Sequence, residues 1–489
     1  MAKPQERLDT YRLYKQSRPV RYLSEDPAPV TEYVLQWIFQ TLGLRSEQVG
    51  SVPAAGVLDL YYGNRKGVTA GIKIPIRETD VLWDALIKGK VSAADCSGRL
   101  DFDIIGAIAR FITDKVNAGL PLQAYDPHGR LLFAHSFQAK AGLATIPVVN
   151  LYISFLRELI AARLGLVGVP LWPSGKTCAI GLSHDVDVPE VYAVLQLPSY
   201  CRGKGLSWHL SVAKRKAKAY LDWIRKVDPE QYWCFDQIME EEAKRGFKST
   251  FFFSAVSRAC KWASGFDVDY DITQPQYRQL FKRIKANGFE IGLHASYNAC
   301  RSADILAAEK RRLEDVAETQ VLGVRHHFWH LGTDPEQTLA FHEQVGLAYD
   351  SSLAWRDSIG FRRSLALPFY PWWSSARRAL SALQFPMFCM DAHVLLFDTP
   401  SREDPLARLK ECTRIIRQTG GLGVIDWHNR TSFPKGGKYQ TWGYAYLELL
   451  DYLASDPEIW VTDLGSAYKW LESWLQKSHY GQDHQHSGC

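Results

Sequence analysis

The sequence predicts an α/β protein, with a smaller α/β domain followed by a barrel or doubly wound sheet of parallel strands. From about residue 176, strand-like runs alternate with helix-length runs, as in parallel strands joined by crossover helices. A chain of 489 residues is also longer than a domain with one hydrophobic core usually is, so at least two domains are expected. The segment 166–176 is rich in proline and glycine and is the predicted boundary.

The expected elements follow from apolar runs and their flanking breakers. In residues 1–165, called here the N-terminal domain, we expect helices at 30–42 and 102–119 and strands at 57–63 and 71–75. In the barrel domain, 166–478, we expect strands at 178–184, 249–256, 290–295, 323–329, 387–395 and 422–427. Helices are expected there at 229–245, 274–286, 303–318 and 405–418, and residues 479–489 form a polar tail.

The composition is that of a globular protein, with 46% hydrophobic and 23% charged residues. A net charge of +5 is too small to indicate a nucleic-acid partner. The nine cysteines include no C-x-x-C pair, which argues against a disulfide framework or a thiolate zinc site. The first residues lack the apolar core of a signal peptide, and the apolar stretch 146–164 contains charged residues. We therefore expect a cytoplasmic protein.

Polar side chains cluster at the ends of four predicted strands. The first run, "GLSHDVD", ends at residue 187, and charged groups there are costly unless they are paired or bind a metal. In barrels, chemistry gathers at the carboxyl ends of the strands, so we expect the four clusters to form one site. Their members are His184, Asp185 and Asp187; His294 and Asn298; Arg325, His326 and His327; Asp426 and His428.

Each cluster alone has a simpler explanation, because a lone histidine is often a hydrogen-bonded core residue and an aspartate often caps a helix. Four clusters together favour a site. Asp185 and Asp187 can share a face of an extended chain, and a carboxylate with an imidazole suits zinc or another divalent ion. The second carboxylate can accept a proton from metal-activated water, and a histidine can protonate the leaving group.

These residues resemble the motifs of the polysaccharide deacetylase family, the NodB-homology carbohydrate esterases. The resemblance covers residues 175 to about 475 and includes "SHDVD", "HASYN", "VRHHF" and "DWHNR". It implies a distorted (β/α)7-type barrel and a metal-dependent hydrolase that removes acetyl groups from a carbohydrate. The fold class expected is thus α/β, a distorted (β/α)7-type barrel with a smaller N-terminal α/β domain.

The resemblance also implies residue roles. Asp185 corresponds to the general base, Asp187 and His294 to metal ligands, Arg325 to the arginine that orients the base, and His428 to the general acid. The family's second metal histidine is replaced by Asn298. Either Asn298 binds through its carbonyl oxygen, or His326 or His327 completes the shell, or the metal, expected to be Zn²⁺, is held weakly. We expect the residues that neighbour the metal ligands and catalytic groups to be His184, His326, His327 and Asp426.

The function implied is removal of an N-acetyl group, with O-acetyl less favoured, from a sugar or glycan intermediate of surface-polysaccharide biosynthesis. A catalytically decayed glycan-binding barrel and a hydrolase that cuts a different amide or glycosidic bond are the alternatives. Aromatic side chains can cover sugar faces, so Tyr297, Trp355 and Trp427 are candidates for substrate binding, with core packing as the default.

The stretch 202–226 contains eight Lys or Arg and one acid, with apolar residues at helical spacing. A solvated helix face is its default interpretation. The functional alternative is contact with anionic lipid headgroups, as in a peripheral membrane protein, or with the diphosphate of a lipid- or nucleotide-linked sugar.

Overall fold

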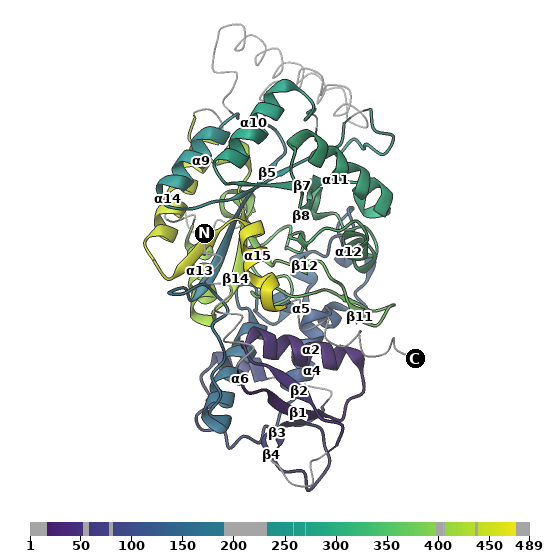
Figure 1. Ribbon diagram of the computed structural model, residues 1–489, viewed down its shortest axis with the longest axis vertical. Coiled ribbons are helices and arrows are strands. Elements are labelled where there is room, and N and C mark those ends of the chain that lie inside the picture. Colours follow the sequence, from purple (N-terminus) through teal and green to yellow (C-terminus); the bar gives the residue numbers. More distant parts are fainter. Residues whose placement is uncertain are drawn as a thin grey trace.

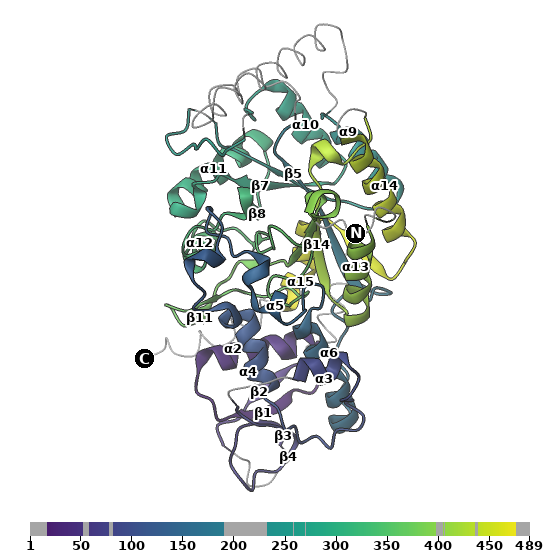
Figure 2. The same ribbon diagram turned by 180° about the vertical axis from the view of Figure 1, so that it is seen from behind.

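The computed structural model describes residues 17–51, 58–77, 82–189, 232–257, 259–268, 270–397, 404, 406–435 and 439–475. Figure 1 shows an N-terminal part (purple to blue) at one end of the molecule and the larger part (teal to yellow) beyond it. The view from behind in Figure 2 shows the same division, with helices α2 (Pro29–Thr41) and α6 (Val148–Leu164) on the side that faces the larger part.

The N-terminal part is a parallel four-stranded sheet, in the order β2-β1-β3-β4, with helices packed on it. Its strands are β1 (Val20–Ser24), β2 (Ser46–Gln48), β3 (Leu58–Tyr62) and β4 (Ala70–Ile74). Its other helices are α3 (Leu82–Ile87), α4 (Ile104–Ile112) and α5 (Phe137–Lys140). Asp103 caps α4 by accepting a hydrogen bond from Gly106 N at 2.7 Å, which satisfies one of the unpaired amides of the first turn.

One continuous hydrophobic core joins the N-terminal part to the larger part. Trp37 of α2 is buried there and donates from Nε1 to the carbonyl of Pro368 at 3.0 Å. Asn150 of α6, also fully buried, both donates to Ala366 O and accepts from Ala366 N. Because buried polar groups need such partners, these bonds specify how the two parts dock.

The larger part alternates parallel strands with helices. Its strands are β5 (Cys178–Val186), β6 (Thr250–Phe253), β7 (Glu290–Ala295), β8 (Gly323–His326), β9 (Tyr349–Asp350), β12 (Leu383–Gln384), β13 (Met387–Met390), β14 (Leu422–Asp426) and β15 (Ile459–Thr462). Its helices are α9 (Phe235–Lys244), α10 (Pro275–Ala286), α11 (Ala303–Ala317), α12 (Pro335–Gln344), α13 (Ala407–Thr419), α14 (Gln440–Ala454) and α15 (Leu464–Leu475). A short hairpin pairs β10 (Trp372–Trp373) with β11 (Arg378–Ala379).

The sheet closes into a barrel through a single extended segment. The strand order is β12-β9-β8-β7-β6-β5-β14-β13, and its two end strands are separated in the chain only by Phe385 and Pro386. Phe385 N donates to Asp350 O of β9 at 2.9 Å, and Val424 N of β14 donates to Pro386 O at 2.9 Å. Apart from β15, which pairs with β5 off this path, the barrel therefore has seven positions, with the segment 383–390 as one of them, and the expected (β/α)7-type fold is confirmed.

Two expected strands end earlier than their apolar runs suggest. The run 323–329 leaves the sheet after His326, since Phe328 (φ 60°) and Trp329 (φ 51°) adopt left-handed conformations that cost about 1–3 kcal/mol each in non-glycine residues. The run 387–395 leaves it after Met390. The strands β9, β12 and β15, none longer than four residues, were not expected.

None of the described helices combines the length and the apolar character needed to cross a membrane. The basic stretch 202–226 and the tail 479–489 lie outside the described residues.

Candidate active site

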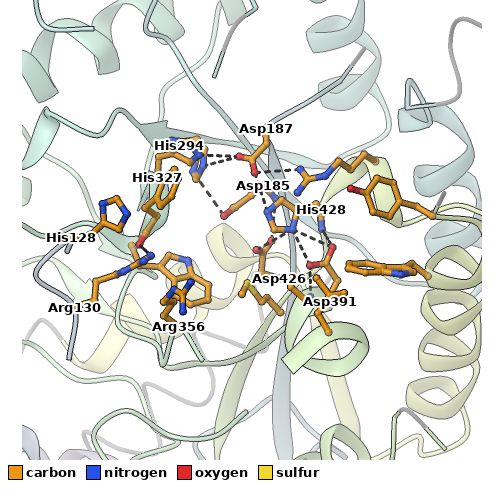
Figure 3. A pocket seen from close by; sticks show the side chains of 18 residues that line it. His128, Arg130, Asp185, Asp187, His294, His327, Arg356, Asp391, Asp426 and His428 are labelled. Atoms are coloured by element: carbon orange, nitrogen blue, oxygen red, sulfur yellow. Dashed lines mark hydrogen bonds and ion pairs between the residues drawn. The ribbon is translucent and has the colours of Figure 1, made fainter. Parts of the chain in front are cut away.

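A pocket of about 380 Å³ opens at the carboxyl ends of β5, β7, β8, β13 and β14 (Figure 3). Parallel strands bring their carboxyl ends to one rim of a barrel, so residues far apart in the sequence meet there. The residues singled out from the sequence that line it are Asp185, Asp187, His294, His327, Asp426 and His428.

Asp185 is held by Arg325 behind the pocket wall. The Arg325 guanidinium is completely buried and donates to Asp185 Oδ1 at 2.8 Å and to Ser183 Oγ at 2.9 Å. Its Nε donates to the carbonyl of Ser351 at 3.1 Å, and its plane lies over the ring of Phe252 at 4.5 Å. A planar fork with this many partners has one geometry, so it orients the Asp185 carboxylate.

Asp187, His294 and His327 form a cluster of ligand-type atoms. His294 Nε2 lies 3.3 Å and His327 Nε2 lies 3.6 Å from Asp187 Oδ1. His294 Nδ1 donates to the carbonyl of Arg325 at 3.1 Å, which leaves the Nε2 lone pair directed at Asp187. Within the described residues, His294 Nε2 and Asp187 Oδ1 are buried without any hydrogen-bond partner. One carboxylate and two imidazoles with unused lone pairs fit a divalent metal such as Zn²⁺.

The charge states of Asp187 and His327 suit a ligand role. Burial favours the neutral acid, but His428, His294 and His327 around Asp187 outweigh it and hold the pKa of that carboxyl well below its usual value. Burial also lowers the pKa of His327 to about 4, against the opposing effect of Asp187. Asp187 is therefore ionised and His327 neutral at pH 7, the forms that bind a cation.

The structure does not bring Asn298 to this cluster. Its side-chain amide donates to the carbonyl of Trp262 at 2.7 Å, and Asn298 is not among the pocket-lining residues. Asn298 follows the end of β7 by three residues and starts a short 3₁₀ turn, Ala299–Arg301. Of the alternatives left open by the sequence, His327 is the residue whose imidazole lies beside Asp187.

His428 is held by a residue that sequence reasoning missed. Both oxygens of Asp391 lie 3.1 Å from His428 Nδ1, and Asp391 also accepts from the His428 amide at 3.2 Å and from the Thr431 hydroxyl. The opposite ring nitrogen, Nε2, lies 3.2 Å from Asp187 Oδ2 and so faces the pocket. Burial alone would favour neutral His428, but Asp391, Asp426 and Asp187 raise the pKa of its imidazole well above 6.5. A charged His428 beside the cluster of Asp187, His294 and His327 can donate a proton.

Asp426 contacts Asp185 and Arg325 at the back of the pocket. Its Oδ1 accepts from the Asp185 amide at 3.1 Å and lies 3.3 Å from Arg325 Nη1. Burial and the nearby Asp185 charge raise the pKa of Asp426 to about 7.

His184 and His326 lie outside the pocket, because adjacent residues of a strand point to opposite faces. His184 Nε2 contacts Glu242 Oε1 at 2.8 Å, and its ring stacks on Phe251 at 4.8 Å. His326 Nε2 lies 2.9 Å from His342 Nε2 of α12. Both histidines are fully buried and belong to the packing behind the barrel wall.

The three aromatic residues expected to bind substrate do not line the pocket. Trp355 and Trp427 are 0% exposed, so a sugar has no access to their rings. Tyr297 is also buried, stacks on His330 at 3.9 Å, and bonds through its hydroxyl to His128. Core packing, the default interpretation, thus describes all three. The aromatic residues that do line the pocket are Phe328, Trp329, Tyr439 and Trp442.

Four basic residues at the pocket were not singled out from the sequence: His128, Arg130, Arg356 and Arg430. Arg430 Nη1 lies 3.3 Å from Asp187 Oδ2, on the side of the carboxylate that also faces His428. His128 and Arg130 come from the N-terminal part, and Figure 3 shows them across the pocket from His428. Neither His128 nor Arg130 follows a predicted strand, so the sequence carries no signal that would place them at the site.

No family model matches the chain, and no curated protein matches it. Among solved structures, the chain is similar to a polysaccharide deacetylase from Mycobacterium smegmatis, with a TM-score of 0.40, 16% identity, and coverage of 63% of this chain and 93% of that one. It is similar to a polysaccharide deacetylase from Pseudomonas aeruginosa, with a TM-score of 0.41, 14% identity, and coverage of 63% and 94%. It is also similar to a pseudoenzyme of the CE4 family from Bacillus anthracis, with a TM-score of 0.29, 11% identity, and coverage of 60% and 66%. The similarities are too distant to assign site residues, and the barrel assignment rests on the strand pairing described above.

Proposed function

We propose that the protein is a metal-dependent deacetylase that hydrolyses an N-acetyl group on a sugar or glycan intermediate. The observation that supports this most is the meeting of a metal-type cluster, Asp187, His294 and His327, with an oriented carboxylate, Asp185, and a charged imidazole, His428, in one pocket. Amide hydrolysis needs these three functions together.

Zn²⁺ is the metal we propose, held by Asp187, His294 and His327. When bound, such an ion lowers the pKa of a water ligand and polarises the acetyl carbonyl. The second oxygen of Asp187 stays in contact with His428 and Arg430, which keeps the carboxylate in one orientation.

Asp185 is the proposed general base. Its carboxylate, oriented by Arg325, accepts the proton of the attacking water. His428, oriented by Asp391, donates its Nε2 proton to the departing amine, since an amide nitrogen is a poor leaving group until it is protonated. An O-acetyl ester needs this acid step less, so the charged His428 favours N-acetyl substrates.

The family resemblance and the sequence lead to four further proposals. These are a role in surface-polysaccharide biosynthesis, a carrier-linked substrate, a cytoplasmic location and membrane contact through 202–226. For the sugar itself, we propose contact with Phe328, Trp329, Tyr439 and Trp442, since these aromatic side chains line the pocket.

Acetate release from a panel of N- and O-acetylated oligosaccharides tests the function. The purified protein should release acetate, lose that activity on chelation, and regain it with Zn²⁺. Asp185→Asn should abolish activity without loss of metal. Sugar binding without metal and without acetate release would instead favour a glycan-binding protein. Cleavage of a different bond by the metal-loaded protein would favour the other hydrolase.

A further inference from the structure

The turn that carries His327 into the pocket has an unusual backbone. Phe328 and Trp329 follow His327 directly and have φ values of 60° and 51°. Two successive bulky aromatic residues in the left-handed region are disfavoured, and such a conformation persists only where the surroundings hold it.

His327 also lacks the contact that orients the other two imidazoles. His294 bonds through Nδ1 to the Arg325 carbonyl, and His428 bonds through Nδ1 to Asp391. The buried His327 Nδ1 has no hydrogen-bond partner within the part of the chain that the structure describes. The direction of the His327 ring therefore depends on the backbone of its own turn.

Arg130, from the N-terminal part, holds this turn. Its Nη1 donates to the carbonyl of Phe328 at 2.7 Å, and its guanidinium lies 5.7 Å from the centre of the Phe328 ring. The neighbouring His128 ring packs against the same phenyl ring at 5.1 Å. Figure 3 shows Arg130 and His128 on the His327 side of the pocket.

Hydrogen bonds within its own turn also fix the position of Arg130. Asp126 accepts from Arg130 Nε at 2.8 Å, and its other oxygen accepts from the backbone amides of His128 and Arg130 at 2.9 and 3.0 Å. Gly129, with φ of 75°, closes the turn. His128 Nδ1 adds a bond of 2.9 Å to the hydroxyl of Tyr297 in the loop after β7. The segment 126–130, called here the clamp turn, is thus preorganised and anchored on two barrel loops.

We propose that Arg130 is a positioning residue for His327, and that the clamp turn makes the metal affinity of the barrel depend on the N-terminal part of the chain. This inference rests on the proposed function, because it takes Asp187, His294 and His327 as the ligands. The N-terminal part would thus hold the His327 turn in place, which the barrel residues do not do.

Metal affinity of the apo full-length protein tests the proposal, measured by competition with a chromophoric Zn²⁺ chelator. Arg130→Gln should weaken Zn²⁺ binding about 10- to 100-fold, the effect typical of residues that orient ligands. Arg130→Lys, which keeps the charge and loses the fork, should lie between Gln and wild type. The visible spectrum of the Co²⁺ form should change in Arg130→Gln, since it reports ligand geometry.

Arg362→Gln is the matched control. Arg362 pairs with Asp114 at 2.8 Å and so also joins the N-terminal part to the barrel, but through the loop 357–366 instead of the His327 turn. Its Zn²⁺ affinity should match wild type. Thermal unfolding of both variants shows whether either simply fails to fold.

A second variant separates positioning from general destabilisation. Asn tolerates the left-handed region, so Phe328→Asn relieves strain that Arg130 must otherwise hold. In that background, Arg130→Gln should cost less Zn²⁺ affinity than in wild type. Equal costs in both backgrounds, or wild-type affinity in Arg130→Gln, would overturn the proposal.

The same titrations keep this proposal separate from the proposed function. If the wild-type protein binds no Zn²⁺, or His327→Ala binds it as tightly as wild type, the metal site itself is wrong. If His327→Ala loses affinity and Arg130→Gln does not, only the role of Arg130 is wrong.

Discussion

Asp391 contacts Nδ1 of His428 at 3.1 Å, although 37 positions separate the two residues in the chain. The contact points the other ring nitrogen, Nε2, at the pocket, and the carboxylate favours the charged imidazole. Of the two, only His428 belongs to a motif that the sequence displays.

Asp391→Asn should therefore impair catalysis of amide hydrolysis. An amide side chain orients His428 less well and does not stabilise its charge, so kcat on an N-acetylated oligosaccharide should fall about 10²-fold, within the range for acid–base groups. The fall on an O-acetyl ester should be smaller. Steady-state acetate release measures both, with Asp236→Asn, an exposed ion-pair residue of α9, as the control. Equal losses on the two substrates would contradict the role of His428 as acid.

His327→Ala and Asn298→Ala should have opposite outcomes. His327→Ala removes an imidazole 3.6 Å from Asp187 and should reduce bound Zn²⁺ below one equivalent after dialysis. Asn298→Ala removes a bond to the Trp262 carbonyl and should leave the Zn²⁺ content at the wild-type level. Elemental analysis of the dialysed proteins gives the metal content. The reverse result would return the third ligand position to Asn298.

Arg325→Ala should be costly for stability as well as activity. The change leaves Asp185 and Asp426 buried without their cation, and breaking a buried pair from one side typically costs about 3–5 kcal/mol. Urea unfolding measures the free energy. Arg325→Lys keeps the charge, so its free energy of unfolding should be closer to that of wild type. Because lysine cannot contact Asp185, Ser183 and Ser351 together, this variant should release acetate slowly. A lysine variant with full activity would show that orientation of Asp185 is unimportant.

The buried pair His326 and His342 should make the protein sensitive to acid. Burial, and for His326 the neighbouring His342, lower the pKa of each imidazole to about 3. The unfolded chain binds these protons near pH 6.5 and the folded chain does not, so stability is present above pH 6.5 and lost as pH falls toward 3. Each imidazole should contribute a loss on the order of 2 kcal/mol between pH 7 and 5.

His342→Phe tests that assignment. The variant is expected to be less stable at pH 7, because His326 Nε2 loses its partner. Its further loss between pH 7 and 5, followed by urea unfolding, should nevertheless be smaller than that of wild type. A slope as steep as wild type would mean that other groups cause the acid sensitivity.

The sequence was informative where one strand carries its own signal. The run 290–295 is mostly apolar and carries His294 one position before its end, and β7 has those bounds. Asp185, Asp187, His294, Asp426 and His428 each follow such a run, and all of them line one pocket. Alternation along a strand also explains why His184 and His326, one position away from inward-facing residues, point out of it.

The remaining site residues depend on tertiary contacts that have no local signal. His327 lies beside Asp187 in a turn whose next two residues, both aromatic, take left-handed conformations, which apolar periodicity does not encode. The apolar run 387–395 predicts Asp391 inside a strand, but that strand ends one residue before it. The two-residue strands β9 and β12 are too short for any pattern to indicate.

The seven-position barrel closes through one stretch of main chain, 383–390, which bonds to β9 at its start and to β14 at its end. If segment 383–390 separates from β9, its bonds to β14 are weakened as well, and the reverse also holds. The two sets of bonds should therefore open together. In a hydrogen–deuterium exchange experiment, the amides of Phe385 and Val424 should therefore exchange at a common rate, although they belong to opposite margins of the sheet.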